Sequence, residues 1–280
     1  MKILANDGLS AKAIKTLEGA GFEVLTTKVA QNQLAPFINE EQIDILLVRS
    51  ATQAKRDLID ACPALKLIGR GGVGMDNIDV VYAQEKGIKV INTPNASSHS
   101  VAELTFAHLF SGVRFLYDAN RNMPLEGDTR FNELKKDYAN GHELRGKTLG
   151  IIGLGRIGRA VATIALGLGM KVIAYDPEQQ EATITLSFFD GRSLDFVIKT
   201  ISKKEVLEEA DFITLHIPAQ KEAVIGEKEF QQMKDGVGII NVARGGVIDE
   251  EALLHALEHE KVAFAGLDVF EGETTPSIRI

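Results

Sequence analysis

Three glycines in the middle of the chain have the spacing needed to bind a dinucleotide. Gly153, Gly155 and Gly158 fit the pattern G-x-G-x-x-G. In this pattern the first glycine permits a tight turn, the second lets the backbone approach a pyrophosphate, and the third lets a helix pack closely on a strand. The pattern alone is weak evidence, because glycine-rich turns are common. It predicts a phosphate-binding turn only where a strand precedes it and a helix follows it.

The segments around these glycines have the required character. Residues 149–152 are apolar and predict a strand, and residues 156–168 repeat apolar residues on one helical face. A second apolar segment, 172–175, ends directly before Asp176, which lies 18 residues after Gly158. A carboxylate at this place accepts hydrogen bonds from the ribose hydroxyls of an adenosine and repels a 2′-phosphate. Because Pro177 and not an arginine follows it, the sequence predicts NAD as the cofactor.

A second group of glycines could bind an anion. Gly71, Gly72 and Gly74 follow the predicted strand 65–68. Successive backbone N–H groups in such a loop can form a concave site for a substrate carboxylate. The same glycines could equally serve only to permit a turn. Loop chemistry alone leaves both interpretations open.

The elements that position these loops form two α/β series. Strands rich in Ile, Leu and Val that alternate with helical patterns are typical of parallel sheets covered on both faces. We therefore predict an α/β protein with two doubly wound parallel-sheet domains and a ligand cleft between them. The expected strands are residues 2–5, 22–25, 45–48, 65–68 and 89–91 in the first series, and 148–152, 171–175, 212–216, 238–242 and 264–269 in the second.

Two segments depart from this alternation. Residues 100–120 predict one long helix that connects the two series, and residues 121–145 follow as a polar segment with Pro124. Residues 183–201 alternate apolar and polar side chains around Asp190-Gly191. Such a dipeptide between alternating segments predicts a β-hairpin, at a place where these units usually have a helix.

Composition excludes several classes of protein. The net charge is −8 over 280 residues, so a surface for nucleic acid or for an anionic membrane is not expected. Cys62 is the only cysteine, which rules out an internal disulfide and favours a reducing compartment. No apolar segment approaches the roughly 20 residues that span a bilayer. We expect a soluble cytoplasmic protein without a metal site.

Three longer motifs resemble those of the D-2-hydroxyacid dehydrogenases. They are residues 147–158, 240–250 and 266–270, and the resemblance covers nearly the whole chain. It implies a flavodoxin-like substrate domain at residues 1–98 and a Rossmann NAD domain at residues 99–275. Residues 276–280 would begin a return to the substrate domain. The resemblance also implies a homodimer formed through the NAD domain.

The resemblance places the family's catalytic residues at Arg244 and Glu273, which lie 29 residues apart, with Glu271 as the competing glutamate. A guanidinium can hold the carboxylate of a 2-oxo acid and polarise its carbonyl oxygen. The glutamate would hydrogen-bond a histidine, raise its pKa and keep it able to exchange the alcohol proton. The family carries this histidine in a Pro-His-x-Gly motif, which we expect beyond Ile280.

The resemblance further implies which residues contact cofactor and substrate. Segments 48–53 and 69–79 most resemble family members that oxidise a phosphorylated 2-hydroxy acid, so such a small molecule is the expected substrate. A glyoxylate or hydroxypyruvate reductase and a non-catalytic NAD-binding regulator stay as alternatives. Cofactor contacts beyond the glycines and Asp176 are Val101, Arg156, Ile157, Tyr175, His216, Pro218, Val242, Ala243 and Asp268. Substrate contacts are Arg49 for the phosphate, with Arg70 as a weaker candidate, and Ser50, Gly72, Val73, Gly74 and Arg244.

Overall fold

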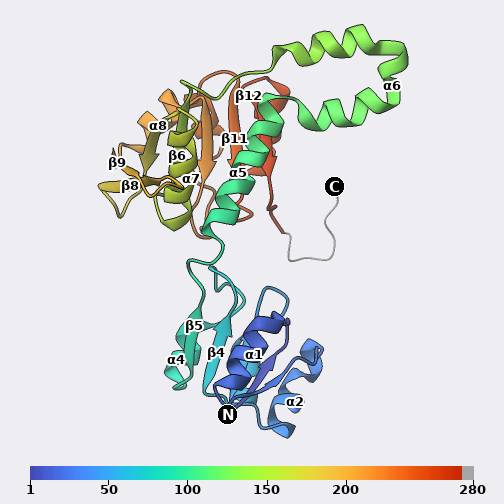
Figure 1. Ribbon diagram of the computed structural model, residues 1–280, viewed down its shortest axis with the longest axis vertical. Helices are drawn as coiled ribbons and strands as arrows, with labels where there is room; N and C mark the ends of the chain where they lie inside the picture. The colour runs from blue at the N-terminus through green and yellow to red at the C-terminus, as the bar shows by residue number, and fades with distance from the viewer. Residues whose placement is uncertain (273–280) are drawn as a thin grey trace. The chain divides into compact units, whose positions relative to one another are not determined.

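The computed structural model describes residues 1–272 and divides into two compact units at Ser97 and Ser98. Each unit has its own five-stranded parallel sheet (Figure 1). Counted within each unit and without the hairpin, both sheets have the strand order 2-1-3-4-5, which is typical of flavodoxin-like doubly wound folds. The predicted fold class, two parallel-sheet α/β domains, is therefore confirmed.

The first unit has the strand order β2-β1-β3-β4-β5, with all neighbours parallel. Its main core lies between this sheet and the helices α2, α3 and α4, where Leu46 and Ile68 pack against Leu34 and Leu58. The strands are β1 (Lys2–Ala5), β2 (Glu23–Leu25), β3 (Ile45–Val48), β4 (Leu67–Arg70) and β5 (Lys89–Asn92). The helices are α1 (Ala11–Gly19), α2 (Leu34–Glu40), α3 (Arg56–Ala61) and α4 (Val80–Glu85), with a 3-10 turn η1 (Gln31–Gln33).

Strand β4 begins and ends two residues later than expected. The sequence predicted residues 65–68, with Gly71, Gly72 and Gly74 in the loop that follows. In the structure Gly69 is a strand residue, paired with Leu47 of β3. A Cβ atom on Gly69 would lie 2.7 Å from the Leu47 side chain, so this glycine makes room for the neighbouring leucine. Close packing between strands therefore explains a glycine at a strand position beyond the predicted end.

The second unit has the strand order β12-β11-β10-β6-β7. Helices α5 and α7 share a core with one face of the sheet, and α8, α9 and α10 share a core with the other. The strands are β6 (Thr148–Ile152), β7 (Lys171–Tyr175), β10 (Phe212–Leu215), β11 (Val237–Asn241) and β12 (Val262–Leu267). The helices are α5 (Ser98–Val113), α6 (Leu116–Asp137), α7 (Arg156–Gly167), α8 (Lys203–Glu209), α9 (Glu227–Gln232) and α10 (Glu250–Glu258), with a 3-10 turn η2 (Tyr138–Asn140).

The single helix expected at residues 100–120 is wrong in its extent. Helix α5 ends at Val113, and Phe115 has left-handed backbone angles (φ 52°, ψ 34°) before α6 begins. Helix α6 then continues to Asp137 through the predicted polar segment, and Figure 1 shows it projecting from the sheet of its unit. A kink at Arg130 divides it, and the guanidinium pairs with Glu126 and Glu133. A helix that packs little of its surface against its own unit lacks the apolar periodicity by which helices are recognised.

The predicted hairpin is present. Strands β8 (Glu181–Ser187) and β9 (Ser193–Lys199) pair antiparallel, and the five-residue turn between them contains Gly191 at φ +85°. The buried side chains of Ala182, Ile184 and Ile198 join the core formed with α7. Helix α8 follows, so the hairpin is added before the usual helix and does not replace it.

Across the described residues, no helix combines the length and the apolarity that a bilayer crossing requires. The expected cytoplasmic location stays a prediction.

Candidate active site

The two loops that follow β6 and β10 meet at the carboxyl edge of the second sheet. From β6 the chain continues to β7 on one side of the sheet, and from β10 it continues to β11 on the other. Ligands of doubly wound sheets bind in the crevice at such a change of direction. Here Gly153 follows β6, and a Cβ atom on it would lie 2.6 Å from the His216 carbonyl oxygen after β10. The predicted phosphate-binding turn therefore lies where the topology places a ligand.

The three motif glycines have different surroundings. Gly153 has φ +98°, which favours glycine, and a Cβ atom on Gly158 would lie 2.1 Å from the Gly153 carbonyl oxygen. Gly155 has no atom within 4 Å of the corresponding position and caps α7 without a side-chain hydrogen bond. The N–H groups of the first turn, which Arg156 and Ile157 begin, are therefore available for an anion. The open space beside Gly155 fits a pyrophosphate.

Asp176 ties the end of β7 to this turn. Its carboxylate accepts hydrogen bonds from the backbone N–H groups of Leu154 at 2.8 Å, Glu178 at 2.9 Å and Gln179 at 3.2 Å. A carboxylate offers about four acceptor positions, so about one stays available for a ligand hydroxyl. Tyr175 is the last residue of β7 and precedes it directly. The predicted ribose acceptor is thus held beside the phosphate-binding turn.

His216 is neutral in this fold. Burial lowers the pKa of its ring to about 3, and Thr214 Oγ1 lies 3.0 Å from its Nε2 atom. Its buried Nδ1 atom has no hydrogen-bond partner among residues 1–272. A ring that stays unprotonated near neutral pH cannot serve as a proton donor to substrate. The backbone of His216 lies beside Gly153, and Pro218 follows two residues later.

Arg244 lies in a tightly bonded loop after β11. The Asn241 side chain accepts from the Ala243 N–H at 3.0 Å and donates to the Arg244 carbonyl oxygen at 2.9 Å. The Arg244 guanidinium donates to the Ala243 carbonyl oxygen at 2.7 Å. This loop, with Val242, begins at the same carboxyl edge of the sheet as the glycine turn. The structure therefore holds the predicted catalytic arginine on a fixed backbone.

The segment after β12 packs against the Arg244 loop. A Cβ atom on Gly245 would lie 2.0 Å from the Phe270 carbonyl oxygen, and the Asp268 N–H donates to the Asn241 carbonyl oxygen at 3.0 Å. Glu271 donates its N–H to a Glu250 carboxylate oxygen at 2.6 Å. Glu273 lies outside the described residues, as do residues 276–280. Asp268 is exposed, and Val101 lies in the first turn of α5.

A cavity lies at the carboxyl edge of the first sheet, and of the predicted substrate residues Arg49 and Arg70 line it, whereas Ser50, Gly72, Val73 and Gly74 do not. Its volume is about 620 Å³, and its lining includes Asp7, Ser10, Arg49, Arg70 and Asn92. Arg49 and Ser50 are exposed at the end of β3. The Arg49 side chain has no hydrogen-bond or ion-pair partner in the described part of the chain. It is therefore available for an anion.

The glycine loop is anchored through its carbonyl groups. The Gly72 oxygen accepts from the Thr93 N–H at 3.2 Å, the Val73 oxygen from the Asn92 side chain at 2.7 Å, and the Gly74 oxygen from Arg70. The Gly72 N–H donates to the Arg70 oxygen at 3.0 Å. The N–H groups of Val73 and Gly74 have no partner within residues 1–272, which leaves these two for a substrate carboxylate. Arg70, with 15% of its side chain exposed, holds this loop.

Sequence reasoning missed the polar residues that hold these loops. Asn92 ends β5, Asn241 ends β11, and Asp7 follows β1 by two residues. Each lies near the last apolar residue of a parallel strand, where the sheet edge opens. A polar side chain at that position is a signal in the sequence, because a buried amide or carboxylate must find hydrogen-bond partners.

Comparisons with known proteins agree with this geometry. Residues 106–279 match the family of D-isomer specific 2-hydroxyacid dehydrogenases, NAD-binding domain. The chain is 43% identical over 275 residues to a hydroxypyruvate reductase of Thermotoga maritima, covering 97% of this chain and 83% of the relative. It is 42% identical over 275 residues to a D-3-phosphoglycerate dehydrogenase of Methanocaldococcus jannaschii, covering 98% of this chain and 49% of the relative. The chain thus spans about half the length of that dehydrogenase.

A solved structure gives the same result. A D-lactate dehydrogenase from Aquifex aeolicus, in complex with NAD and lactic acid, superposes with a TM-score of 0.72. It is 32% identical and covers 100% of this chain and 82% of that chain. The protein belongs to the D-isomer specific 2-hydroxyacid dehydrogenase family, a class of NAD-dependent oxidoreductases, and its cofactor is NAD.

Proposed function

We propose that the protein is a D-3-phosphoglycerate dehydrogenase, which oxidises D-3-phosphoglycerate to 3-phosphohydroxypyruvate in serine biosynthesis. The observation that carries this proposal is the exposed, unpartnered guanidinium of Arg49 beside the glycine loop of the same unit. A phosphate group requires such a cation, and a substrate without a second anion does not. The 42% identity to an archaeal D-3-phosphoglycerate dehydrogenase supports the proposal.

Each residue has a separate task in this proposal. Arg244 holds the substrate carboxylate and the C2 oxygen, and stabilises the negative charge on that oxygen as the oxo acid is reduced in the reverse direction. The N–H groups of Val73 and Gly74 bind the carboxylate, and Arg49 binds the phosphate. NAD held at the glycine turn and Asp176 would supply the hydride acceptor for the C2 hydrogen. Glu273 would orient the acid/base group that takes the proton of the C2 hydroxyl.

A hydroxypyruvate or glyoxylate reductase is the second candidate. The hydroxypyruvate reductase of Thermotoga maritima is matched over 83% of its length, against 49% for the archaeal dehydrogenase. In such a reductase Arg49 would be an exposed arginine without a substrate role. The two candidates therefore differ in what they require of this one side chain.

Steady-state kinetics of the full-length protein test the proposal. We expect NAD-dependent oxidation of D-3-phosphoglycerate with a kcat/KM at least tenfold above the value for D-glycerate. Efficient NADH-dependent reduction of glyoxylate or hydroxypyruvate without turnover of phosphoglycerate would establish the second candidate instead. NAD binding without turnover of any of these substrates would indicate a regulator.

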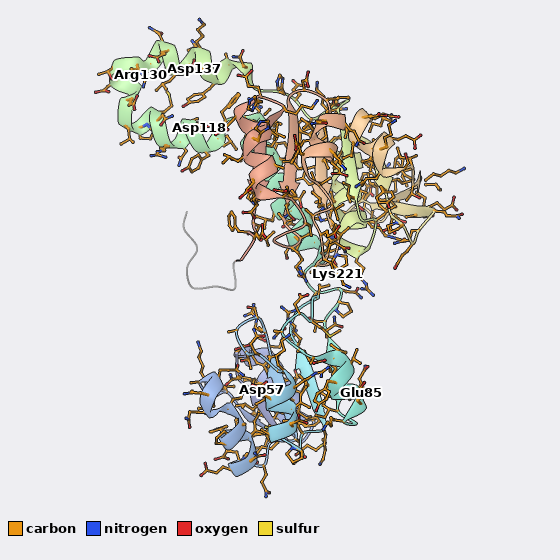
Figure 2. All side chains as sticks on the ribbon, turned by 180° about the vertical axis from the view of Figure 1, so that it is seen from behind. Asp57, Glu85, Asp118, Arg130, Asp137 and Lys221 are labelled. Atoms are coloured by element: carbon orange, nitrogen blue, oxygen red, sulfur yellow. The ribbon has the colours of Figure 1, made fainter. Side chains whose placement is uncertain are left out.

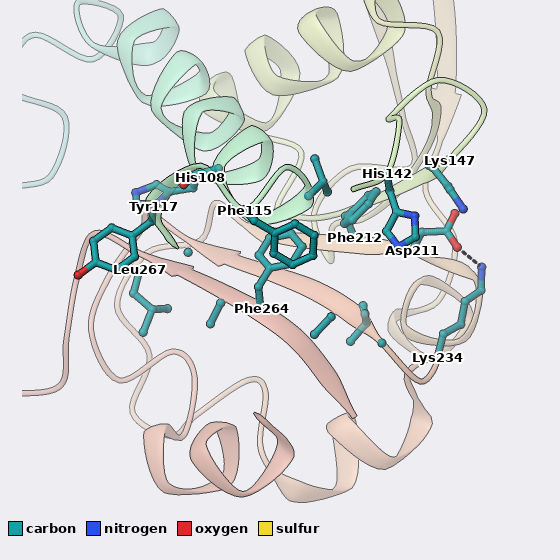
Figure 3. Close-up of a pocket in the computed structure, with 18 of the residues that line it drawn as sticks. His108, Phe115, Tyr117, His142, Lys147, Asp211, Phe212, Lys234, Phe264 and Leu267 are labelled. Carbon is teal, nitrogen blue, oxygen red and sulfur yellow. Dashed lines mark hydrogen bonds and ion pairs between the residues drawn. The ribbon is translucent and has the colours of Figure 1, made fainter. Parts of the chain in front are cut away.

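We further propose a homodimer formed through the second unit. Helix α6 carries exposed apolar side chains, with 73% of Leu125 and 50% of Phe131 accessible, and Figure 2 shows it extending away from the sheet at Asp118, Arg130 and Asp137. A cavity of about 860 Å³ lies at the base of this helix. Figure 3 shows the aromatic rings of Phe115, Tyr117, Phe212 and Phe264 around it. An arm with exposed apolar side chains and a recess with aromatic rings in its lining, both on one unit, can pair with each other between two copies.

Light scattering after gel filtration tests the dimer. Leu125→Asp places a charge on the arm, and we expect it to shift the mass from two chains toward one. Phe189→Asp is the matched control, because Phe189 is fully exposed on the hairpin turn of the same unit. A monomeric wild-type protein, or equal effects of both substitutions, would contradict the proposed interface.

A further inference from the structure

The loop that carries Arg49 is bonded from two sides by side chains without an assigned role. The Asp7 carboxylate accepts from the Arg49 N–H at 2.6 Å, the Thr52 N–H at 3.2 Å and the Thr52 hydroxyl at 2.8 Å. The Asn77 amide donates to the carbonyl oxygens of Arg49 at 2.8 Å and Thr52 at 2.6 Å. Both peptide groups that flank the Arg49 side chain therefore have a fixed partner.

These contacts are buried at Thr52 and exposed at the Asp7 bond to the Arg49 N–H. Thr52 is 3% exposed and Asn77 is 6% exposed, and the Asn6 side chain donates a further hydrogen bond to the Thr52 hydroxyl at 2.8 Å. Hydrogen bonds that are shielded from water hold their geometry more strictly, because solvent does not compete for them. The shielded bonds at Thr52 therefore anchor the loop, and the Arg49 guanidinium stays exposed at the cavity.

The network lies at the change of chain direction in the first sheet. The chain leaves β1 toward β2 on one side and leaves β3 toward β4 on the other. Asp7 follows β1, and Arg49 follows β3, its neighbour. This is the crevice in which doubly wound sheets bind ligands. Asp7 therefore connects the two loops that open the crevice.

Asn77 joins the Arg49 loop to the glycine loop. It belongs to the segment that continues from Val73 and Gly74, and its carbonyl oxygen accepts from the Ala54 N–H at 2.8 Å. Lys55 donates to the Asp76 carbonyl oxygen at 2.5 Å across the same boundary. The cationic group and the two carboxylate-binding N–H groups are thereby parts of one bonded frame within this unit.

The Asp7 carboxylate lies beside a site proposed to bind an anion, so its negative charge must be offset by hydrogen bonds. Asp7 would repel a phosphate if its charge faced the cavity unopposed. Three donors already share this charge, which satisfies most of the four acceptor positions of a carboxylate. An asparagine here would keep the size, but it would turn an NH₂ group toward one of these donors, which removes a hydrogen bond and adds a repulsive contact.

We propose that Asp7 and Asn77 are positioning residues that fix Arg49 relative to the glycine loop and so select a 2-hydroxy acid with a second anionic group at a fixed distance from its carboxylate. The inference rests on the proposed function, in which Arg49 binds the phosphate. A short acid such as glyoxylate has no group at the Arg49 position, so it uses only the carboxylate-binding N–H groups of this frame. The two residues therefore control specificity and not turnover in general.

The test compares two substrates in full-length variants. We expect Asp7→Asn, Asn77→Ala and Arg49→Ala each to lower kcat/KM for 3-phosphohydroxypyruvate by roughly tenfold to a hundredfold, since displacing a binding group by about 1 Å has effects of this size. The kcat/KM for glyoxylate should fall by a clearly smaller factor, because glyoxylate has no group at the Arg49 position, and the Kd for NADH should change less than threefold. Asn39→Ala is the matched control, because Asn39 also donates to a backbone oxygen, that of Ala61 at 2.8 Å, in the same unit but outside the cavity.

A double-substitution cycle separates positioning from a general structural role. In the Arg49→Ala background, Asp7→Asn should have no further effect on the ratio of the two kcat/KM values, because it acts through Arg49. Thr52→Val is a milder variant for the case that Asp7→Asn unfolds, and it should change the ratio in the same direction. Equal losses for both substrates, or an undiminished effect in the double variant, would overturn the inference.

The same data separate this inference from the proposed function. If Arg49→Ala lowers the ratio but Asp7→Asn, Thr52→Val and Asn77→Ala do not, the positioning role is wrong and the phosphate contact stands. If Arg49→Ala itself leaves the ratio unchanged, the proposed phosphate contact fails, and the positioning role fails with it.

Discussion

The α-carbon of Gly158 faces the carbonyl oxygen of Gly153 so closely that a Cβ atom on Gly158 would lie 2.1 Å from that oxygen. The first turn of α7 thus packs directly on the turn that follows β6. This contact fixes the direction in which the N–H groups at the start of the helix point. In this motif the packing of the helix on the turn, at Gly158, is therefore separable from phosphate binding, at Gly155.

Gly158→Ala and Gly155→Ala should separate these roles. A methyl group at residue 158 collides with backbone, and we expect the free energy of unfolding to fall by roughly 1–3 kcal/mol, as for other overpacked sites. Residue 155 has no atom within 4 Å of an added Cβ, so its variant should unfold like the wild type but bind NAD at least tenfold more weakly. Urea unfolding and NADH titration measure both effects. Normal NAD affinity in Gly155→Ala would contradict the expected pyrophosphate position.

Asp176 should decide between NAD and NADP. A 2′-phosphate beside this carboxylate places like charges together, which costs several kcal/mol. We expect wild-type protein to prefer NADH over NADPH by at least about a hundredfold, and Asp176→Ser to reduce the preference below tenfold. The dissociation constants of NADH and NADPH, measured for the wild type and for Asp176→Ser, test this preference.

The neighbouring Glu178→Gln removes a charge without removing the three backbone hydrogen bonds that Asp176 accepts. This control should keep the NADH preference. If it loses the preference as Asp176→Ser does, the general charge of the segment and not the Asp176 carboxylate makes the selection.

Much of the fold followed from the sequence, because buried parallel strands are short apolar segments with clear borders. Strands β1, β3, β6 and β7 have the predicted bounds. The Asp190-Gly191 dipeptide correctly predicted the hairpin, since its glycine adopts a positive φ. Prediction failed for α6 and was displaced by two residues for β4 and for β12, which was expected at residues 264–269 and spans Val262–Leu267. Gly69 lies in a strand for reasons of packing between strands, and α6 has too small a packed face to show periodicity.

The sequence predicted the loops of the candidate site but not the polar residues that hold those loops in place. Gly153, Asp176 and Arg244 belong to local patterns, which a sequence displays directly. The bonds from Asp7 to Arg49 and from Asn77 to Thr52 join residues that are 42 and 25 positions apart. Such pairs depend on which strands are neighbours, and a single sequence does not contain that information in any local window.

His216 should make the protein less stable in acid. Its ring has a pKa of about 3 in the fold and an ordinary value of 6.5 when unfolded. Between these values only the unfolded chain takes up the proton, so the contribution of this residue to stability is full above pH 6.5 and is lost as the pH falls. The loss reaches at most about 1.4 kcal/mol per pH unit.

Urea unfolding of the wild type and of His216→Phe at pH 7, 6 and 5 measures this contribution. We expect the free energy of unfolding of the wild type to fall more steeply than that of the variant over this range. Leu254→Phe is the control, because Leu254 is exposed on α10 and the substitution adds a ring without removing a titratable group. Parallel curves for the wild type and His216→Phe would show that the ring is accessible to protons in the folded state.

Arg244 should be required for turnover and not for cofactor binding. Arg244→Lys keeps the charge but replaces a planar fork of donors with a single point charge, which cannot hold a carboxylate and a carbonyl oxygen together. We expect kcat to fall roughly a hundredfold to a thousandfold, the size seen when one stabilising donor is removed from a reacting oxygen. The Kd for NADH should stay within about threefold.

The control is Arg192→Lys, on the exposed hairpin turn and paired with Asp190, which should have no effect on kcat. A kcat for Arg244→Lys within threefold of the wild type would remove this arginine from the reaction and with it the central residue of the proposed site.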